Sequence, residues 1–254
     1  GHPKPCFSLR LNGGNLGYRY QRTRIPAFPG SDHKIMAYVR TADMHYSRGY
    51  LEGFYMDRFG KVLADTVTYS SPIGPSPDGG NDWRLISFEL PFSNPEGRFI
   101  GLGMYLVQAD ALPENVGRLR SEYRTDIRAR MDVDELAVLR LPQCRLNLLD
   151  NKVLYDVNER AVAQILVADP IGGDLTAQLI VADLAAGTRE TQDHPVQVLP
   201  PLEAILQGAS KAPDPTQHPI GPLQPGLYQI ILEVYSDKEL IIARQVNLAA
   251  LPPR

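Results

Sequence analysis

The stretch from Phe99 to Val107 combines aromatic residues and glycines in a pattern that suits ligand binding. In an extended chain alternate side chains share a face, and here one face carries Phe99, Gly101, Gly103 and Tyr105. Two glycines weaken a strand unless something approaches the backbone closely. We therefore predict a shelf with aromatic edges and no side chains in its middle, suited to the C–H face of a sugar ring. The alternative is that a neighbouring loop or a second domain covers this shelf.

Aromatic residues elsewhere are further candidates for stacking on a ligand. Trp83 is the only tryptophan and begins a predicted strand, and we expect it to pack in the core. Tyrosines in or beside predicted loops are better platforms at the edge of the shelf, and these are Tyr46, Tyr50, Tyr69 and Tyr123. Their alternative role is that of ordinary amphipathic residues at the rim of the protein.

An acidic run, Asp132, Asp134 and Glu135, follows later in the chain. Calcium prefers carboxylate and carbonyl oxygens, so Asp132 and Asp134 are candidates for a structural calcium site. In a regular strand these two point to one side and Glu135 to the other, so at most two of the three are ligands. The alternative, which we favour, is a salt-bridged surface with Arg128 and Arg130. No other cofactor is predicted.

Catalytic residues are not recognisable from their types and spacing. The five histidines are scattered without the spacing of metal ligands. The sequence contains no Gly-x-Ser-x-Gly elbow, phosphate-binding loop or dinucleotide fingerprint. Glycosidases need two carboxylates that face each other across a cleft, and the sequence nominates no such pair. We therefore predict a non-catalytic protein, with a hydrolase of unknown type as the weakest alternative.

Composition and charge exclude several classes of partner. A chain of 254 residues is long enough for one or two domains with substantial cores. Residues 1–142 carry 18 basic and 16 acidic side chains, a balance of +2, whereas residues 143–254 carry 8 and 13, a balance of −5. No Lys/Arg cluster is interleaved with aromatic residues, which argues against nucleic acid. No run approaches the roughly 18 to 20 consecutive apolar residues of a membrane span.

Extended segments with turn residues between them dominate the first half. Apolar alternation is clear after Trp83, where every second residue is apolar: Ile86, Phe88 and Leu90. The closing segment, Ala129 to Leu141, repeats the alternation and predicts one core face, formed by Met131, Val133, Ala137, Leu139 and Leu141. Glu135 interrupts this face and predicts a bulge near Asp134. Many short strands without a long amphipathic helix predict an antiparallel β-sandwich. The predicted strands cover residues 7–11, 17–25, 34–41, 50–56, 62–69, 83–90, 99–107 and 129–141.

The second half, which begins after Pro142, also consists of short predicted strands separated by turn residues. That proline divides the chain into predicted domains of residues 1–142 and 143–254. The strand number and the length of the second domain are typical of an immunoglobulin-like sandwich. One short helix is predicted over residues 201–208, and the final hairpin is predicted to turn at Ser236-Asp-Lys-Glu239. The predicted strands cover residues 145–149, 161–167, 177–182, 196–199, 227–235 and 240–248.

Four segments between Ser31 and Leu141 match, in order and spacing, a family of glycan-binding domains. They are Lys34-Ile-Met-Ala-Tyr-Val-Arg-Thr41, Phe54-Tyr-Met-Asp-Arg-Phe-Gly60, Asp82-Trp-Arg-Leu-Ile-Ser-Phe88 and Asp134-Glu-Leu-Ala-Val138. Together they resemble the jelly-roll carbohydrate-binding modules with a galactose-binding-like fold, although Glu135 replaces the second aspartate of the closing motif. The resemblance implies a jelly-roll sandwich, a glycan ligand and a calcium near the closing strand. Residues 145–248 resemble a bacterial immunoglobulin-like or fibronectin-like module.

Two hypotheses for function follow from these observations. The first is a non-catalytic glycan-binding module, and the second is a pair of structural spacer or protein-interaction modules in a multidomain assembly. The chain begins Gly-His-Pro and ends Leu-Pro-Pro-Arg, so we expect a piece of a longer exported, periplasmic or cell-surface protein. Its partners would be a glycan or other domains of that parent. Cys6 and Cys144 form either a disulfide across the first domain or two unpaired buried thiols.

Overall fold

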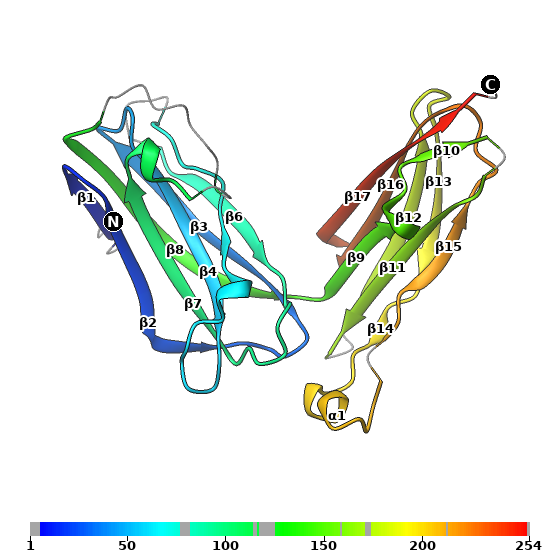
Figure 1. Cartoon of the computed structure of the whole chain (residues 1–254), viewed down its shortest axis with the longest axis horizontal. Helices are drawn as coiled ribbons and strands as arrows, with labels where there is room; N and C mark the ends of the chain where they lie inside the picture. Colours follow the sequence, from blue (N-terminus) through cyan, green and yellow to red (C-terminus); the bar gives the residue numbers. More distant parts are fainter. Residues whose placement is uncertain are drawn as a thin grey trace. The chain divides into compact units, whose positions relative to one another are not determined.

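The computed structural model describes residues 6–76, 82–113, 116, 125–157, 159–170, 174–211 and 213–252. Within these ranges the chain is all-β, with one short α-helix and three 3-10 turns (Figure 1). It divides into two compact units, residues 1–140 and 141–254. The division lies two residues before the predicted boundary at Pro142. No helix in the described part of the chain is both long and apolar enough to cross a membrane.

The first unit is a sandwich of two four-stranded sheets. One has the order β1-β8-β3-β6 and the other β2-β7-β4-β5. Two 3-10 turns, η1 (Ala64–Thr66) and η2 (Ala109–Ala111), follow β4 and β7. The strands are β1 (Phe7–Asn12), β2 (Leu16–Pro26), β3 (Asp32–Ala42), β4 (Arg48–Met56), β5 (Thr68–Tyr69), β6 (Arg84–Leu90), β7 (Phe99–Val107) and β8 (Arg128–Leu141).

The predicted strand over residues 62–69 is mostly wrong. It shrinks to the two residues of β5 because the chain first forms η1. The Thr66 hydroxyl donates to the carbonyl of Leu63 at 2.7 Å and accepts from the backbone N–H of Tyr55 at 2.9 Å. A side chain therefore takes the place of a strand neighbour beside β4. Local side-chain hydrogen bonds of this kind compete with sheet ladders.

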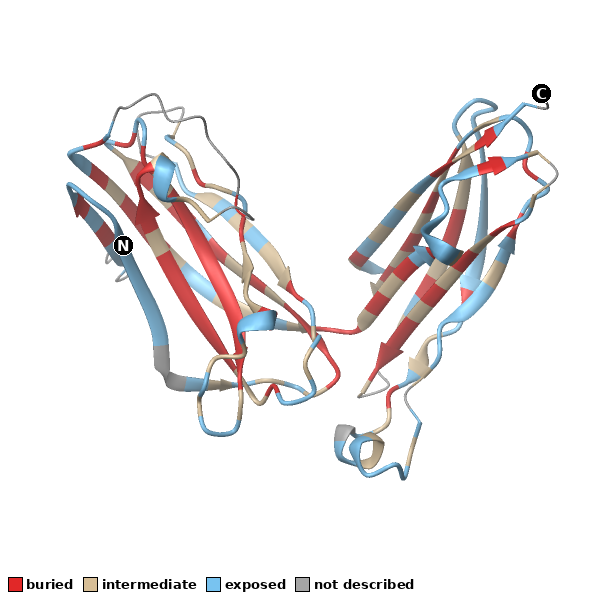
Figure 2. Ribbon diagram, viewed as in Figure 1, coloured by how far each residue is buried: buried red, intermediate tan, exposed pale blue. Residues whose placement is uncertain are grey.

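The core of the first unit lies between the inner faces of the two sheets. Figure 2 shows buried residues alternating with more exposed ones along several strands. Leu51 of β4, Leu106 of β7 and Met131 of β8 belong to one buried cluster, and Ile35 and Ile100 belong to the next. Burial of each such side chain stabilises the fold by about 1.5–3 kcal/mol. The alternation predicted from the sequence is the cause of this layering.

A buried polar chain crosses one part of this core. His33 of β3 is 2% exposed, and its Nδ1 lies 2.8 Å from the Tyr55 hydroxyl. That hydroxyl donates to the carbonyl of Leu90 at 3.1 Å, so Nδ1–H of His33 donates to Tyr55. Burial lowers the pKa of His33 to about 4, because a charged ring in this position would be shielded from water. The imidazole is therefore neutral at physiological pH.

The closing strand β8 changes its alternation partway along. Met131 and Val133 are buried in the first core, as predicted. Glu135 has a φ of 50°, a break of the kind that a bulge produces. Beyond it Val138 packs against the core, whereas Leu139 is 45% exposed. The predicted core position of Leu139 is therefore wrong, because the break reverses which residues point inward.

The second unit is also a β-sandwich. One sheet has the order β10-β17-β16-β12-β13, and the other has β14-β11-β15 with β9 also pairing with β11. The 3-10 turn η3 (Leu149–Asn151) and the helix α1 (Leu202–Leu206) are its other elements. The strands are β9 (Gln143–Leu148), β10 (Leu154–Asp156), β11 (Ala161–Asp169), β12 (Leu175–Asp183), β13 (Thr188–His194), β14 (Gln197–Val198), β15 (Thr216–Ile220), β16 (Gly226–Ser236) and β17 (Glu239–Leu251).

The last hairpin and the cysteines test two expectations. Asp237 and Lys238 both have positive φ, 49° and 71°, as the favoured two-residue hairpin turn requires. The turn predicted between β16 and β17 is therefore present. Cys6 is exposed and Cys144 is buried, and no disulfide joins these two described residues. Cys144 lies on β9 of the second unit, so the predicted alternative of a disulfide across the first domain is wrong.

Candidate binding surface on the first unit

The glycine face of β7 is filled, not open. The strand register places Gly101 opposite Phe54 and Gly103 opposite Glu52. A Cβ atom at Gly101 would lie 2.2 Å from Cε2 of Phe54, and one at Gly103 would lie 2.4 Å from Oε2 of Glu52. The predicted shelf without side chains is therefore wrong, because β4 lays its own side chains across both glycines. Glycine is required here for this close approach.

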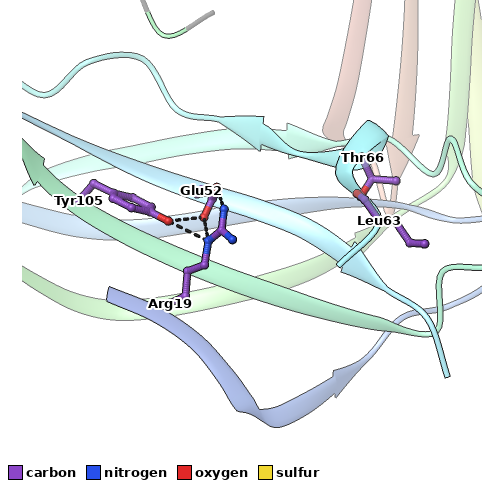
Figure 3. A network of polar contacts seen from close by, with 5 residues as sticks. All are labelled: Arg19, Glu52, Leu63, Thr66 and Tyr105. Carbon is purple, nitrogen blue, oxygen red and sulfur yellow. Dashed lines mark hydrogen bonds and ion pairs between the residues drawn. The ribbon is translucent and has the colours of Figure 1, made fainter. Parts of the chain in front are cut away.

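Beside Gly103, three side chains from three strands form a polar network (Figure 3). Arg19 of β2 donates to both carboxylate oxygens of Glu52 of β4, from Nε at 2.9 Å and from Nη2 at 2.7 Å. The Tyr105 hydroxyl of β7 donates to Oε2 of Glu52 at 2.8 Å and accepts from Nε of Arg19 at 2.8 Å. Each member therefore contacts the other two, and the Tyr105 ring is fixed in place.

The network satisfies a carboxylate that the protein buries. The Glu52 side chain is 1% exposed, whereas that of Arg19 is 42% exposed. Burying a charge is costly unless it is paired and hydrogen-bonded, and Glu52 meets both conditions. The hydrogen bond with Glu52 raises the pKa of Arg19 above its already high value. Burial, assisted by the bond to Glu52, raises the pKa of Tyr105 to about 12, so its hydroxyl stays protonated and donates.

Three of the predicted tyrosines meet on this face. The rings of Tyr50 and Tyr105 stack with centroids 4.7 Å apart at an interplanar angle of 8°, and Tyr69 meets Tyr50 edge-on at 5.6 Å. Tyr50 is only 5% exposed, so it supports the other two rings and is not itself a platform. Tyr69 and Tyr105 are partly exposed. Next to Tyr105, exposed Gly17 has no side chain, and a Cβ there would lie 2.5 Å from the ring.

The remaining aromatic candidates lie apart from this cluster. Phe99 is partly exposed at the far end of β7, opposite Met56, with the Arg24 guanidinium 5.1 Å from its ring centroid. Tyr46 lies in the connection before β4 and is 37% exposed. Tyr123 lies outside the described residues. The structure therefore unites Gly101, Gly103, Tyr50, Tyr69 and Tyr105, and leaves Phe99 and Tyr46 outside the group.

The connection that carries Tyr46 is held by a carboxylate that sequence analysis missed. Oδ2 of Asp126 accepts from the backbone N–H groups of His45, Tyr46 and Ser47 at 2.7–2.9 Å and from the Ser47 hydroxyl at 2.6 Å. Burial alone would raise the pKa of Asp126, but the bonds from Ser47, His45 and Tyr46 outweigh it and lower the pKa below its usual value. Asp126 is thus a structural clamp on this connection.

One member of the acidic run of β8, Asp132, forms ion pairs. Asp132 is 3% exposed and accepts from the Ser8 hydroxyl at 2.8 Å. Its Oδ2 also accepts from Nη2 of Arg40 at 2.8 Å and lies 3.3 Å from Nε of Arg130. Arg130 was predicted as a partner, and Arg40 was not. In the described ranges no three His, Cys, Asp or Glu residues are grouped to hold a metal ion. Asp132 is surrounded by guanidinium groups, which disfavours it as a calcium ligand, and the calcium at Asp132 and Asp134 stays a prediction.

Trp83 does not pack in the core as predicted. It is 36% exposed, and the Arg40 guanidinium lies 4.8 Å from its ring centroid. Ile86 and Phe88 of β6 pack against the core. Trp83 is three and five positions before them, so strand alternation sends it to the opposite face. The odd spacing between Trp83 and these two core residues was visible in the sequence.

Comparisons with known proteins give matches of low similarity. No protein-family model matches the sequence, and no curated protein matches it. Two structures of glycosyl hydrolase family 2 members, from Bacteroides cellulosilyticus and from its strain DSM 14838, align at 13% and 12% identity with a TM-score of 0.30. The alignments cover 93% of this chain but only 27% and 28% of those chains.

A third similar structure is the adhesin domain of Epf from Streptococcus pyogenes. It aligns at 10% identity with a TM-score of 0.26, over 95% of this chain and 78% of that one. The chain spans little more than a quarter of the two hydrolase chains. Likenesses at such low TM-scores carry no argument about activity or ligand. The all-β sandwich fold rests on the strands and sheets of the chain itself.

Proposed function

We propose that this chain is a non-catalytic module that binds a glycan on the face of the β2-β7-β4-β5 sheet. The observation that carries the proposal is the setting of Tyr105, a partly exposed ring beside exposed Gly17 with its hydroxyl held by Arg19 and Glu52. A sugar stacks its C–H face on such a ring while its polar groups bond to neighbouring donors. The resemblance of the first half to jelly-roll carbohydrate-binding modules supports the same ligand class.

Arg19 makes an acidic sugar the first ligand to test. Its side chain is 42% exposed beside the Tyr105 ring, while Nε and Nη2 hold Glu52. Guanidinium groups bind carboxylates through charge-assisted hydrogen bonds. A uronic acid that stacks on Tyr105 would bring its carboxylate towards this cation. Neutral glycans would gain the stacking contribution alone.

The non-catalytic part of the proposal is supported by the chemistry of Glu52. Glycoside hydrolysis uses two facing carboxyl groups, one of which gives or takes a proton. Glu52 is buried, and its two oxygens accept from Arg19 and Tyr105, so it is arranged as a structural anion. We extend the proposal to the setting of the chain, as a module of a larger exported, periplasmic or cell-surface protein.

The test is a glycan array of neutral and acidic sugars probed with the whole chain, followed by calorimetry on the best hit. We expect Tyr105→Ala to weaken binding about tenfold, the loss of one stacking contact. Tyr105→Phe keeps the ring and should lose less. Tyr235→Ala, a partly exposed tyrosine of the second unit, is the matched control and should bind normally. An array without hits, or equal affinity for Tyr105→Ala and the native chain, contradicts the proposal.

A structural function is the second candidate, and one observation favours it. Phe54 and Glu52 fill the positions above Gly101 and Gly103, which makes this part of the face a packed surface. A spacer or contact module needs such rigidity and no ligand. In that case Tyr105→Ala would lower the free energy of unfolding while the array stayed empty. The two candidates therefore separate in a single set of measurements.

A further inference from the structure

A shallow hollow lies on the outer face of the other sheet of the first unit. It is lined by Tyr38 of β3, Trp83 just before β6, and Asp134 and Glu135 of β8. Its volume is about 220 Å³. Pockets for drug-sized ligands are about 300–1,000 Å³, so this hollow suits one small group at a time. Two aromatic and two acidic side chains around one space form a distinctive combination.

The tryptophan of this hollow contacts an arginine that a buried carboxylate holds in place. Nη2 and Nε of Arg40 donate to Oδ2 of Asp132 at 2.8 and 3.2 Å, and the same guanidinium lies over the Trp83 ring. The Asp132 side chain is 4% exposed, so the anchor of this chain of contacts is buried. Trp83 and Tyr38 nevertheless remain 36% and 38% exposed. The rings are therefore positioned and accessible together.

The backbone of β8 brings both carboxylates to the same hollow. Regular alternation would send Asp134 and Glu135 to opposite faces of the sheet. Instead Glu135 has a φ of 50°, which residues other than glycine rarely adopt, and its N–H donates to Oδ1 of Asp134 at 2.8 Å. This local turn corrects the expectation that Glu135 points away from its acidic neighbour. Unusual backbone conformations are concentrated at functional sites.

We propose that this hollow binds a protonated amine, the cationic group of a small organic ligand. Aromatic faces attract cations, and the contact between Arg40 and Trp83 is already one such pair. Carboxylates accept charge-assisted hydrogen bonds from ammonium N–H groups, and Asp134 and Glu135 supply two carboxylates. The amine belongs to an amino sugar or to an aliphatic chain. The proposal does not rest on glycan binding at Tyr105, which lies on the other sheet.

The test uses the fluorescence of Trp83, the only tryptophan of the chain. The whole chain is titrated at constant ionic strength with glucosamine, with n-butylamine and with neutral N-acetylglucosamine. We expect a saturable change with at least one amine and none with the neutral sugar. Glucosamine alone would indicate a sugar-borne amine, and butylamine would indicate an aliphatic one. No saturable change with either amine, or equal binding of N-acetylglucosamine, overturns the proposal.

Removing one carboxylate tests the role of the acidic pair. Glu135→Gln should weaken amine binding about tenfold, because the ammonium then meets a neutral amide oxygen and loses its ion pair with the carboxylate. Glu239→Gln makes the same change at an exposed hairpin position of the second unit and should leave the affinity unchanged. Asp134→Asn gives a second variant in case Glu135→Gln alters folding, which urea unfolding would reveal. Native affinity in both hollow variants contradicts the proposal.

Discussion

Substitution of Gly101 tests the finding that β4 fills the glycine face of β7. In Gly101→Ala the new Cβ would lie 2.2 Å from Cε2 and 2.4 Å from Cζ of Phe54, whereas ordinary contact begins near 3.4 Å. Phe54 is fully buried, so its ring has no open space to enter and must move by more than 1 Å. Overpacking of this kind costs about 1–3 kcal/mol. We expect the free energy of unfolding to fall by that amount.

Urea unfolding followed by the fluorescence of Trp83 measures this loss, because the only tryptophan lies in the first unit. Gly74→Ala is the matched control, since its Cβ would meet Nε of Arg48 at 3.7 Å, an ordinary contact. It should be neutral, or stabilising by up to about 1 kcal/mol through the unfolded chain. If Gly101→Ala is no less stable than Gly74→Ala, the surface above β7 is open and our description of it is wrong.

Two further predictions use the same unfolding assay, and a third uses amide exchange. Glu52→Gln should cost about 1–3 kcal/mol by weakening the bonds to Arg19, and an unchanged midpoint would show that the network contributes nothing. Acidification from pH 6.5 towards pH 4 should destabilise the first unit by up to about 3 kcal/mol, because His33 takes up a proton when unfolded but not when buried. His33→Gln should flatten that slope, and an unaltered slope would contradict the assignment. Asp126→Asn should speed amide exchange at Ser47, whose N–H loses a charged acceptor; exchange at the native rate would exclude the clamp.

The sequence predicts much of the fold because side-chain alternation is a local property. The strand 99–107 and the turn between β16 and β17 were found from neighbours within a few positions. The strand predicted over residues 62–69 is wrong over most of its length because Thr66 bonds locally, which competes with extended structure. Trp83 was assigned to the core because it begins a strand and because the resembling family places a core tryptophan there, although its parity with Ile86 and Phe88 indicated the opposite face.

The candidate site depends instead on which strands become neighbours. Arg19 and Glu52 are 33 positions apart, and Glu52 and Tyr105 are 53 apart. Alternation assigns each residue to a face of its own strand but says nothing of the side chain that the next strand lays beside it. The sequence therefore predicted that Gly101 and Gly103 admit a close approach. Strand register determined that the approaching groups are Phe54 and Glu52 and not a ligand.

Both sheets of the first unit use an arginine to join a buried carboxylate to an aromatic ring. On one face Arg19 pairs with Glu52 and lies 5.2 Å from the centroid of Phe54. On the other, Arg40 pairs with Asp132 and lies over Trp83. Each guanidinium offsets the cost of burying its carboxylate and fixes the orientation of the ring.

The exposure of the ring separates these two similar arrangements. Phe54 is 0% exposed, so the first arrangement serves packing, and the ligand contact that we propose on that face falls to Tyr105 beside it. Trp83 is 36% exposed next to two carboxylates, so the second arrangement presents its ring directly to solvent. The same three chemical groups thus stabilise one face and, on the other, hold an exposed ring at the hollow where we propose binding. Loss of Arg40 should therefore weaken binding at the hollow, whereas loss of Arg19 should act first on stability.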